Sequence, residues 1–296
     1  MPVGQHPLGP PTVSGNDVTV DTMLEQPTRV TRFLSDITLQ DFLLEDLFVS
    51  AGGVSGGAVI YDMPTVNELY PERDVQQVEV GAEFPVLTSD RRAPLVALVE
   101  KWGGKVWIPD EAITRNQTMV YQRELRKMAN AMVRKLNTRA IQILEAAITA
   151  GGGLHDMTGH DWDAILLEGN APTVPTSRAS ADFITAQMER DQQELGIVFD
   201  TLIMNPAQRA ALMIAYGDKY DALLASHNLT VRISNRVTAG TAYLIQRGAL
   251  GEMRVEKPLS TETWRERKTQ RNWTQTDWRG VMYIANPYAV MKLTGL

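Results

Sequence analysis

The feature that most constrains the fold of this chain is a long amphipathic helix, which the sequence predicts over residues 116–149. Apolar side chains recur there at steps of three and four, so they share one face. They are Leu125, Met128, Ala129, Met132, Leu136, Ala140, Ile143, Leu144 and Ala147. The opposite face carries Arg123, Lys127, Asn130, Arg134 and Asn137. At about 1.5 Å per residue this helix is a rod of roughly 50 Å, which suits a structural spine better than a catalytic pocket.

The composition is that of a soluble globular chain and excludes several kinds of site. Of the 296 residues, 44% are hydrophobic and 22% are charged. Because cysteine is absent, disulfides, thiolate metal sites and cysteine nucleophiles are excluded. No apolar run reaches the ~18–20 residues of a membrane-spanning helix, and no signal-peptide pattern opens the chain. We therefore expect cytoplasmic synthesis and no membrane partner.

The charge is unevenly distributed. The chain has a formal net charge of -6, yet the segment from Arg115 to Arg139 carries seven basic residues against the single acid Glu124. A basic stripe on an acidic protein can face a polyanion without sequence preference. An ordinary solvated helix face has the same composition, so the stripe alone does not decide between the two.

Before the spine, the sequence predicts little regular structure. Residues 1–20 are rich in proline and glycine and predict an extended arm. An apolar rhythm over 28–49 predicts a broken helix or helix pair, and the glycines of 51–58 predict a flexible break before a short strand at 59–63. Residues 75–108 alternate as β-strands around a polar turn at 88–92, which predicts a long two-stranded excursion.

After the spine, strands and helices alternate. Residues 151–176 are predicted to be loop-rich. The region 180–245 is predicted to be a compact α/β subdomain. Its elements are helices at 180–195 and 207–224 and strands at 199–204, 229–233 and 241–245. A short strand at 253–255, a charged loop at 262–277 and strands at 280–284 and 289–293 are predicted to complete the chain.

No catalytic, cofactor-binding or metal-binding residue is predicted. The glycines of 52–57 match neither a P-loop nor a dinucleotide fingerprint. The pairs His155-Asp156 and His160-Asp161 could resemble a metal site, but their spacing fits no known zinc motif. Trp264 and Trp273 lie among basic residues and could stack on nucleic-acid bases or form a protein interface.

The order of these segments resembles the major capsid proteins of tailed bacteriophages, which have the Hong Kong 97-type fold. Three stretches carry the resemblance: Ile108-Pro109-Asp110-Glu111-Ala112 before the spine, the strand end followed by Asn-Pro at Leu202-Ile203-Met204-Asn205-Pro206, and the closing segment from Arg279 to Lys292. The resemblance implies an α+β fold with an N-terminal arm, an extended hairpin called the E-loop, a peripheral domain and an α/β axial domain.

That family resemblance also implies where the domains lie. The arm would span residues 1–50, a peripheral-domain strand and connection 51–74, and the E-loop 75–108. The peripheral domain would contain 109–150 and 254–285, including the spine and the charged loop. The axial domain would contain 151–253 and 286–296.

The resemblance implies a structural protein, not an enzyme, and no cofactor. Many copies would form hexamers and pentamers of an icosahedral shell that encloses double-stranded DNA, in a virion assembled in the host cytoplasm. Because the arm starts at Met1, a separate scaffolding protein is expected, together with a portal and possibly a decoration protein. Covalent crosslinks are not expected, since Lys101 and Lys105 lie near the end of the hairpin and Arg91 and Arg92 at its tip.

Two groups of residues would then carry the function. Arg123, Lys127 and Arg134 would face packaged DNA inside the shell. Contacts between subunits would come from the hairpin tip and from the charged loop, where subunits meet at local three-fold positions. These residues are Arg91, Arg92, Trp264, Arg265, Arg267, Lys268 and Arg271.

Two other functions remain open at the level of the sequence. An encapsulin-like bacterial nanocompartment has the same fold and encloses protein cargo. An α/β-class enzyme is the remote alternative, because only the region 180–245 supports it and no site converges there.

Overall fold

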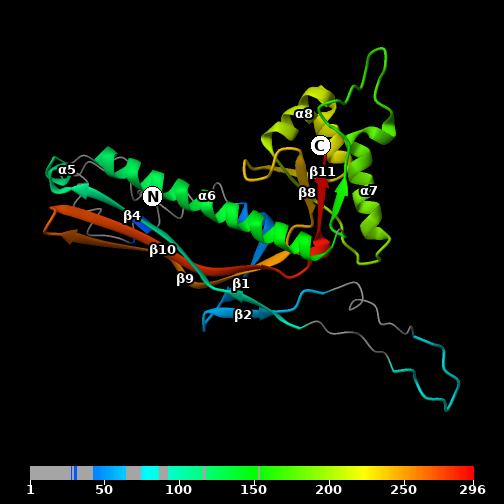
Figure 1. Ribbon diagram of the computed structural model, residues 1–296, viewed down its shortest axis with the longest axis horizontal. Helices are drawn as coiled ribbons and strands as arrows, with labels where there is room; N and C mark the ends of the chain where they lie inside the picture. The colour runs from blue at the N-terminus through cyan, green and yellow to red at the C-terminus, as the bar shows by residue number, and fades with distance from the viewer. Residues whose placement is uncertain are drawn as a thin grey trace, which may run out of the picture.

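The computed structural model describes residues 28, 30–31, 43–64, 75–86, 93–115, 118–152 and 154–296. They form an elongated molecule (Figure 1). A long sheet lies beside a long helix at one end, a compact sheet covered by helices lies at the other, and a thin excursion leaves the body. Within these ranges, no helix is both long and apolar enough to cross a membrane.

The predicted spine is confirmed as α6 (Thr118–Ala150), and the short α5 (Asp110–Thr114) precedes it. Its apolar face is buried along its length, and both Leu125 and Leu144 are fully buried. One residue predicted on the polar face differs. Asn137 is buried, and its Oδ1 accepts a hydrogen bond from the backbone N–H of Leu43 at 3.2 Å. This amide therefore anchors the N-terminal segment on the spine.

The long sheet has the strand order β1-β9-β10-β4. Its strands are β1 (Phe48–Gly53), β4 (Glu100–Pro109), β9 (Gly251–Glu266) and β10 (Arg271–Ile284). β10 pairs antiparallel with β9 and β4, whereas β1 runs parallel to β9. One face packs on the spine, where Ile108 joins Tyr121, Leu125 and Met128 in a core. The hydroxyls of Tyr121 and the buried Thr274 lie 2.9 Å apart in this layer.

The charged loop predicted over 262–277 is wrong, because these residues are the arms of the β9–β10 hairpin with a turn at 267–270. The charges sit on strands whose alternate residues are buried. Thr274 and Thr276 face the core, while Trp264 is 41% exposed.

The flexible break predicted over 51–58 is also partly wrong. Residues 51–53 complete β1, and Gly53 pairs with Val255.

The excursion exists, but its strands differ from those predicted over 75–108. β2 (Ala58–Tyr61) and β3 (Leu95–Leu98) form an antiparallel pair at its base. Residues 75–86 contain no regular strand, and residues 100–108 belong to β4 of the long sheet. The second arm was misassigned because the alternation of β4 fits a body sheet equally well. Arg91 and Arg92, which were predicted at the tip of the hairpin, lie outside the described residues.

The compact sheet has the strand order β5-β11-β8-β6-β7. Its strands are β5 (Asp156–Thr158), β6 (Thr201–Met204), β7 (Thr230–Ile233), β8 (Thr241–Ile245) and β11 (Val290–Thr294). Its helices are α7 (Ala179–Asp191), α8 (Pro206–Tyr216) and α9 (Tyr220–Ser226). Short 3-10 turns are η1 (Pro175–Ser177), η2 (Gly217–Lys219) and η3 (Pro287–Ala289).

The two faces of the compact sheet have different coverings. Ile203 and Tyr243 pack against Leu144 of the spine on one face. Leu244 packs with residues of α7 and α8 on the other. The α/β alternation predicted over 180–245 is thus confirmed, although the predicted helix 207–224 is interrupted at Gly217, whose φ of 50° ends α8.

The N-terminal segment 43–48 packs at the junction between the two sheets. α3 (Leu44–Leu47) lies on the spine, and Leu47 and Phe48 are buried in the same core as Leu144. The buried carboxylate of Asp46 pairs with Arg232 at 3.0 Å and with Arg247 at 3.3 Å, so the segment is also tied to the compact sheet. The helical pattern predicted up to residue 49 therefore ends at Leu47, where β1 begins; most of 28–42 lies outside the described residues.

Truncation of a spine residue tests this core. We expect Leu144→Ala to lower the free energy of unfolding by about 2–5 kcal/mol, because it leaves a cavity between the spine and the compact sheet. The exposed Gln142→Ala on the same helix is the matched control and should change stability by less than about 0.5 kcal/mol. Urea unfolding of the unassembled subunit measures both. A loss below about 1 kcal/mol for Leu144→Ala would contradict this packing.

Candidate functional site

The outer end of the long sheet presents a row of three tryptophans. The strand register places Trp107 of β4 opposite Trp273 of β10, and Trp273 opposite Trp264 of β9. The rings of Trp264 and Trp273 are stacked, with centroids 6.3 Å apart and planes inclined by 16°. Trp107 and Trp264 remain 42% and 41% exposed. This tryptophan row is an exposed aromatic surface on the face of the sheet away from the spine.

Cations lie on the tryptophan row. The guanidinium of Arg271 is 4.0 Å from the ring centroid of Trp107, and the Nζ of Lys105 is 4.6 Å from that of Trp273. Such contacts contribute about 0.5–1 kcal/mol each at exposed sites. Hydrogen bonds from Thr269 and then Trp273 hold the pKa of the Glu266 carboxyl below its usual range. Aromatic side chains and arginine are enriched in protein interfaces.

The structure gives Arg265 a partner within its own chain. Its Nε and Nη2 donate to Oδ2 of Asp110 at 3.0 and 2.5 Å, and Asn272 donates to the other carboxylate oxygen at 2.7 Å. These bonds fasten the hairpin to the residue that begins α5 and so position the tryptophan row. Arg267 and Lys268 are exposed in the turn beyond them. The role predicted for these residues between subunits stays a prediction.

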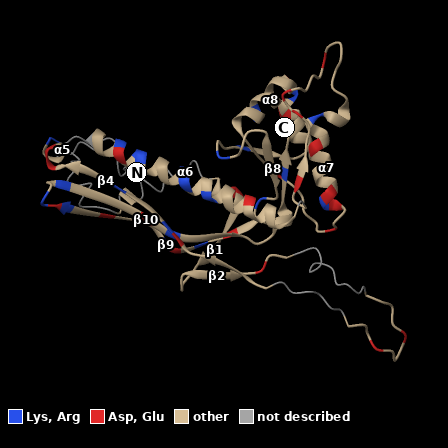
Figure 2. Cartoon of the chain, in the orientation of Figure 1, with Lys and Arg blue, Asp and Glu red and all other residues tan. Residues whose placement is uncertain are grey.

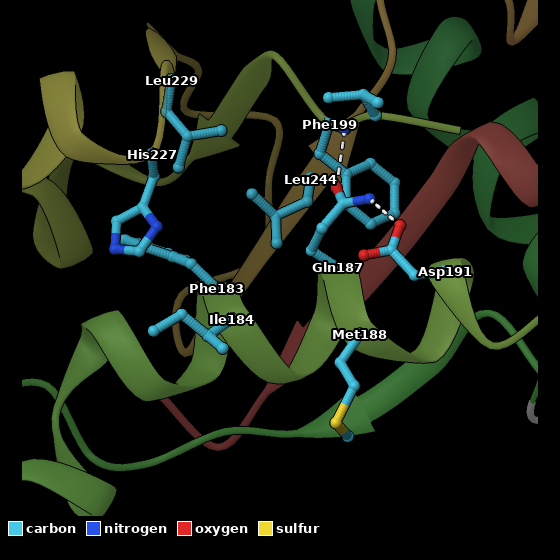
Figure 3. Close-up of a pocket in the computed structure, with 10 residues that line it drawn as sticks. Phe183, Ile184, Gln187, Met188, Asp191, Phe199, His227, Leu229 and Leu244 are labelled. Carbon is cyan, nitrogen blue, oxygen red and sulfur yellow. Dashed lines mark hydrogen bonds between the residues drawn. The ribbon is translucent and has the colours of Figure 1, made fainter. Parts of the chain in front are cut away.

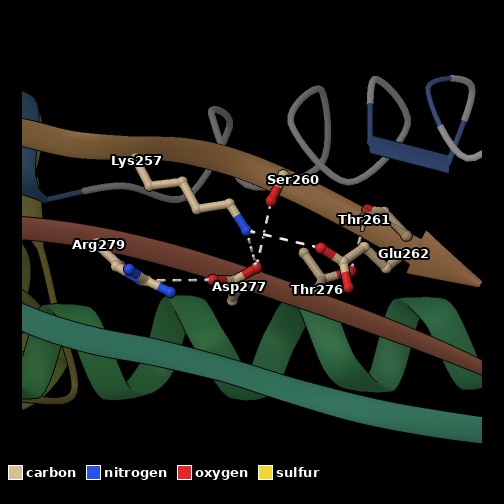
Figure 4. Close-up of polar contacts among 7 residues, drawn as sticks. All are labelled: Lys257, Ser260, Thr261, Glu262, Thr276, Asp277 and Arg279. Atoms are coloured by element: carbon tan, nitrogen blue, oxygen red, sulfur yellow. Dashed lines mark hydrogen bonds and ion pairs between the residues drawn. The ribbon is translucent and has the colours of Figure 1, made fainter.

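A buried carboxylate lies farther along the same hairpin (Figure 4). Asp277 is 4% exposed and accepts hydrogen bonds from Lys257 at 2.8 Å and Ser260 at 3.2 Å, while Arg279 lies 3.8 Å away. The β9–β10 register shifts here, where Pro258 has no N–H to donate to the ladder. Burial raises the pKa of Asp277, but the bonds from Lys257 and Ser260 outweigh it and hold the pKa below its usual range.

The exposed face of the spine carries the predicted basic residues (Figure 2). Arg123, Lys127 and Arg134 are all exposed, and Lys127 forms an ion pair with Glu124 at 2.7 Å. Arg139, at the end of the basic segment, instead turns to the long sheet and pairs with Glu100 at 2.6 Å. The stripe is therefore a solvated cationic surface on the side of the helix away from the long sheet.

The histidines of residues 155–161 are separated by the fold. His155 is buried beside Arg190, whereas the Nδ1 of His160 lies 2.6 Å from Oδ1 of the buried Asp182. The indole N–H of Trp162 also donates to Asp182, which holds this loop on α7. Among the described residues, no three His, Asp or Glu side chains lie close enough to hold a metal ion.

The compact sheet has one groove that the sequence did not reveal (Figure 3). It has a volume of about 310 Å³ and lies along α7, where Ile184 and Met188 are exposed. The Gln187 amide shapes it by donating to Asp191 and accepting from the backbone N–H of Phe199. The imidazole of His227 lies at the opposite end of the groove from Asp191, so the two cannot act together on one substrate atom.

Comparison with known proteins identifies the chain. The sequence profile described as phage capsid protein matches residues 92–293, which is more than half of the sequence. The chain belongs to the phage capsid protein family. No curated protein sequence matches it. As a member of this family it is a major capsid protein with a structural role.

Solved structures show that this capsid protein has the Hong Kong 97-type fold. It is similar to a virus-like particle from Pyrococcus furiosus, with a TM-score of 0.61 and 14% identity over 89% of this chain and 98% of that one. The capsid of Myoviridae phage XM1 gives a TM-score of 0.57 and 16% identity over 86% and 91% of the two chains. The capsid of cyanophage P-SCSP1u gives a TM-score of 0.56 and 13% identity, over 86% of this chain and 88% of that one. At these identities the likeness concerns the fold alone.

Acid titration tests the Asp277 cluster of the capsid protein. Its lowered pKa stabilises the fold above the carboxyl's unfolded pKa, and this stability is lost as the pH falls through the folded value. We expect Asp277→Asn to lower the free energy of unfolding at pH 7 by about 1–3 kcal/mol and to flatten the loss of stability below about pH 4. The control is Glu262→Gln. The native Glu262 carboxylate lies 3.9 Å from the same Lys257 but is exposed. An unchanged acid slope in Asp277→Asn, measured by urea unfolding from pH 2 to 7, would contradict the assignment.

Proposed function

We propose that this capsid protein assembles into a closed icosahedral shell of hexamers and pentamers around packaged double-stranded DNA. The subunit would be built in the host cytoplasm with a separate scaffolding protein and a portal, and a decoration protein could bind outside. Membership of the phage capsid protein family supports assembly into a virion shell. The observation that carries the proposal further is the excursion, whose residues Val80, Phe84 and Val86 are not covered by any of the described residues.

The excursion exposes apolar side chains that the described part of the chain does not cover. Val80 is fully exposed, Phe84 is 77% exposed and Val86 71% exposed, and the segment runs away from the body (Figure 1). A two-stranded ribbon such as β2–β3 is at best marginally stable in water without further packing. Contiguous exposed apolar residues mark interaction sites in soluble proteins. A neighbouring copy is the natural cover, because closed shells reuse one heterologous contact around each symmetry axis.

The tryptophan row and the turn at 267–270 supply a second contact surface. Trp264, Arg267 and Lys268 are exposed there, and Arg271 is half-buried on Trp107. We assign these residues to subunit contacts at local three-fold positions, together with Arg91 and Arg92. Arginine and tryptophan are enriched among the residues that dominate interface energies.

The exposed stripe of the spine is assigned to the inside of the shell. Arg123, Lys127 and Arg134 would meet DNA phosphates, which bind cations without regard to sequence. Packaged DNA needs such non-specific contacts, because any sequence must fit within the shell.

Electron microscopy of the purified protein, alone and co-expressed with its neighbouring genes, tests the proposal. We expect closed shells or capsomer rings, and shells that contain DNA when packaging genes are present. Phe84→Ser should abolish or greatly reduce shells while changing subunit stability by less than about 0.5 kcal/mol, because the side chain is exposed in the subunit. Gln77→Ser in the same segment is the matched control and should assemble normally.

Three results would count against this function. Normal shells from Phe84→Ser would show that the excursion does not make the decisive contact. Shells that hold only protein would favour the nanocompartment. A small discrete oligomer under every condition would contradict shell assembly itself.

Neutralising the spine stripe separates assembly from DNA binding. We expect the triple variant Arg123→Gln, Lys127→Gln, Arg134→Gln to form empty shells. Its affinity for double-stranded DNA should depend less on salt. The slope of the logarithm of the binding constant against the logarithm of the salt concentration should fall by roughly one for each basic residue removed. Fluorescence anisotropy with a DNA duplex measures this slope. The double variant Arg209→Gln, Arg236→Gln removes exposed charges from the compact sheet and should leave the slope unchanged. Loss of empty shells would show that the stripe serves subunit contacts.

A further inference from the structure

A buried arginine joins the elements that meet where the spine ends. Arg190 of α7 is 0% exposed. Its Nη2 donates to the backbone carbonyls of Leu154 at 3.0 Å and Val290 at 2.9 Å, and its Nη1 donates to Gln193 at 2.9 Å. These acceptors are neutral, and the Nε is buried with no hydrogen-bond partner among the described residues. The guanidinium thus ties α7 to the segment after the spine and to the start of β11.

A buried histidine completes this cluster. The Nδ1 of His155 lies 3.1 Å from Nη2 of Arg190, and His155 is 1% exposed. The two hydrogens of Nη2 are shared among the carbonyls of Leu154 and Val290 and the Nδ1 of His155, and a guanidinium has no acceptor, so the imidazole nitrogen that faces it cannot carry a proton without opposing a donor. The ring is therefore neutral here, with its proton on Nε2. A protonated imidazole would place a second donor and a second positive charge against the first.

The imidazole has no room to turn away from the guanidinium. A Cβ added at Gly151 would lie 2.1 Å from the His155 ring, so only glycine fits at the end of the spine. The ring packs edge-on to Tyr288 with centroids 5.0 Å apart, and the backbone carbonyl of His155 accepts from Lys292 at 2.8 Å. The His155 side chain is held between the spine, η3 and α7.

We propose that His155 and Arg190 form an acid-sensitive lock that fixes the compact sheet on the end of the spine, and that protonation of His155 releases it. This proposal rests on the proposed function, because in a shell the release would loosen the junction between the compact sheet and the end of the spine in each subunit while the long sheet stays intact.

The electrostatics of the junction agree with this geometry. Burial and then the charge of Arg190 lower the pKa of His155 to about 4. Since an open junction would give His155 its ordinary pKa near 6.5, the closed form loses stability as the pH falls from about 6.5 toward 4. Burial lowers the pKa of Arg190 to about 10, although Glu189 and then Tyr288 act in the opposite direction, so the guanidinium stays charged over this pH range. The ammonium of Lys292 is turned to Glu145 of the spine at 2.7 Å and so does not compensate the pair.

Amide hydrogen exchange on the full-length protein, at about pH 7 and about pH 4.5 with correction for intrinsic rates, tests the lock. In the wild type we expect protection of peptides covering 150–156 and 286–292 to fall at least tenfold at the lower pH, while β10 changes less than twofold. His155→Gln keeps a neutral acceptor at every pH and should lose this response. The matched control, His227→Gln in the groove of the same part of the molecule, should keep it.

Exchange at the imidazole C2 position, followed by mass spectrometry of the wild type, reads the titration of His155 without any variant. An apparent pKa below about 5 is expected, and a value above about 6 would overturn the proposal. An unchanged junction in the wild type, or the same loss in His155→Gln, would overturn it too. Electron microscopy at neutral pH reports separately on assembly, so a failure of the proposed function is distinguishable from a failure of the lock.

Discussion

One buried stripe on the spine helix fixes the positions of both sheets. Its N-terminal half packs on the long sheet through Tyr121, Leu125 and Met128, and its C-terminal half packs on the compact sheet through Leu144 and Ile148. Because α6 is a single uninterrupted helix, the two sheets cannot move independently of it without exposing apolar area worth about 25 cal/mol per Å². The elongated shape of the subunit follows from the length of this stripe.

Polar contacts at the junction specify how the compact sheet sits on the spine. Glu145 accepts from the hydroxyl of Tyr243 and from Lys292, so one carboxylate holds β8 and β11. Burial, followed by this hydrogen bond, raises the pKa of Tyr243. Apolar packing alone is not directional. The orientation therefore depends on these bonds and on the Arg190 cluster, which lies at the same end of the helix.

The sequence predicted the elements whose pattern is local. The spine and the order of strands and helices around 180–245 follow from periodicity within each segment. The β9–β10 hairpin was mistaken for a loop, since whether a charged segment pairs depends on a partner strand elsewhere. Arg265 illustrates the limit: its carboxylate partner Asp110 lies 155 residues away, so the sequence could not reveal this contact within the chain, and the role of Arg265 between subunits stays a prediction. Asn137 was misplaced for the same reason, because its partner is the arm.

The excursion shows why such a subunit is incomplete alone. Its base is held by Tyr61 on Tyr283, with ring centroids 4.6 Å apart, and by Val59 against Val281. Beyond this small cluster, Val80, Phe84 and Val86 lie exposed. Backbone ordering costs about 1–2 kcal/mol per residue, and none of the described residues buries these side chains to offset that cost. The spine core is therefore set by contacts within the chain, whereas these residues of the excursion leave their apolar side chains available to another surface. Each subunit thus combines a packed body with an exposed apolar segment.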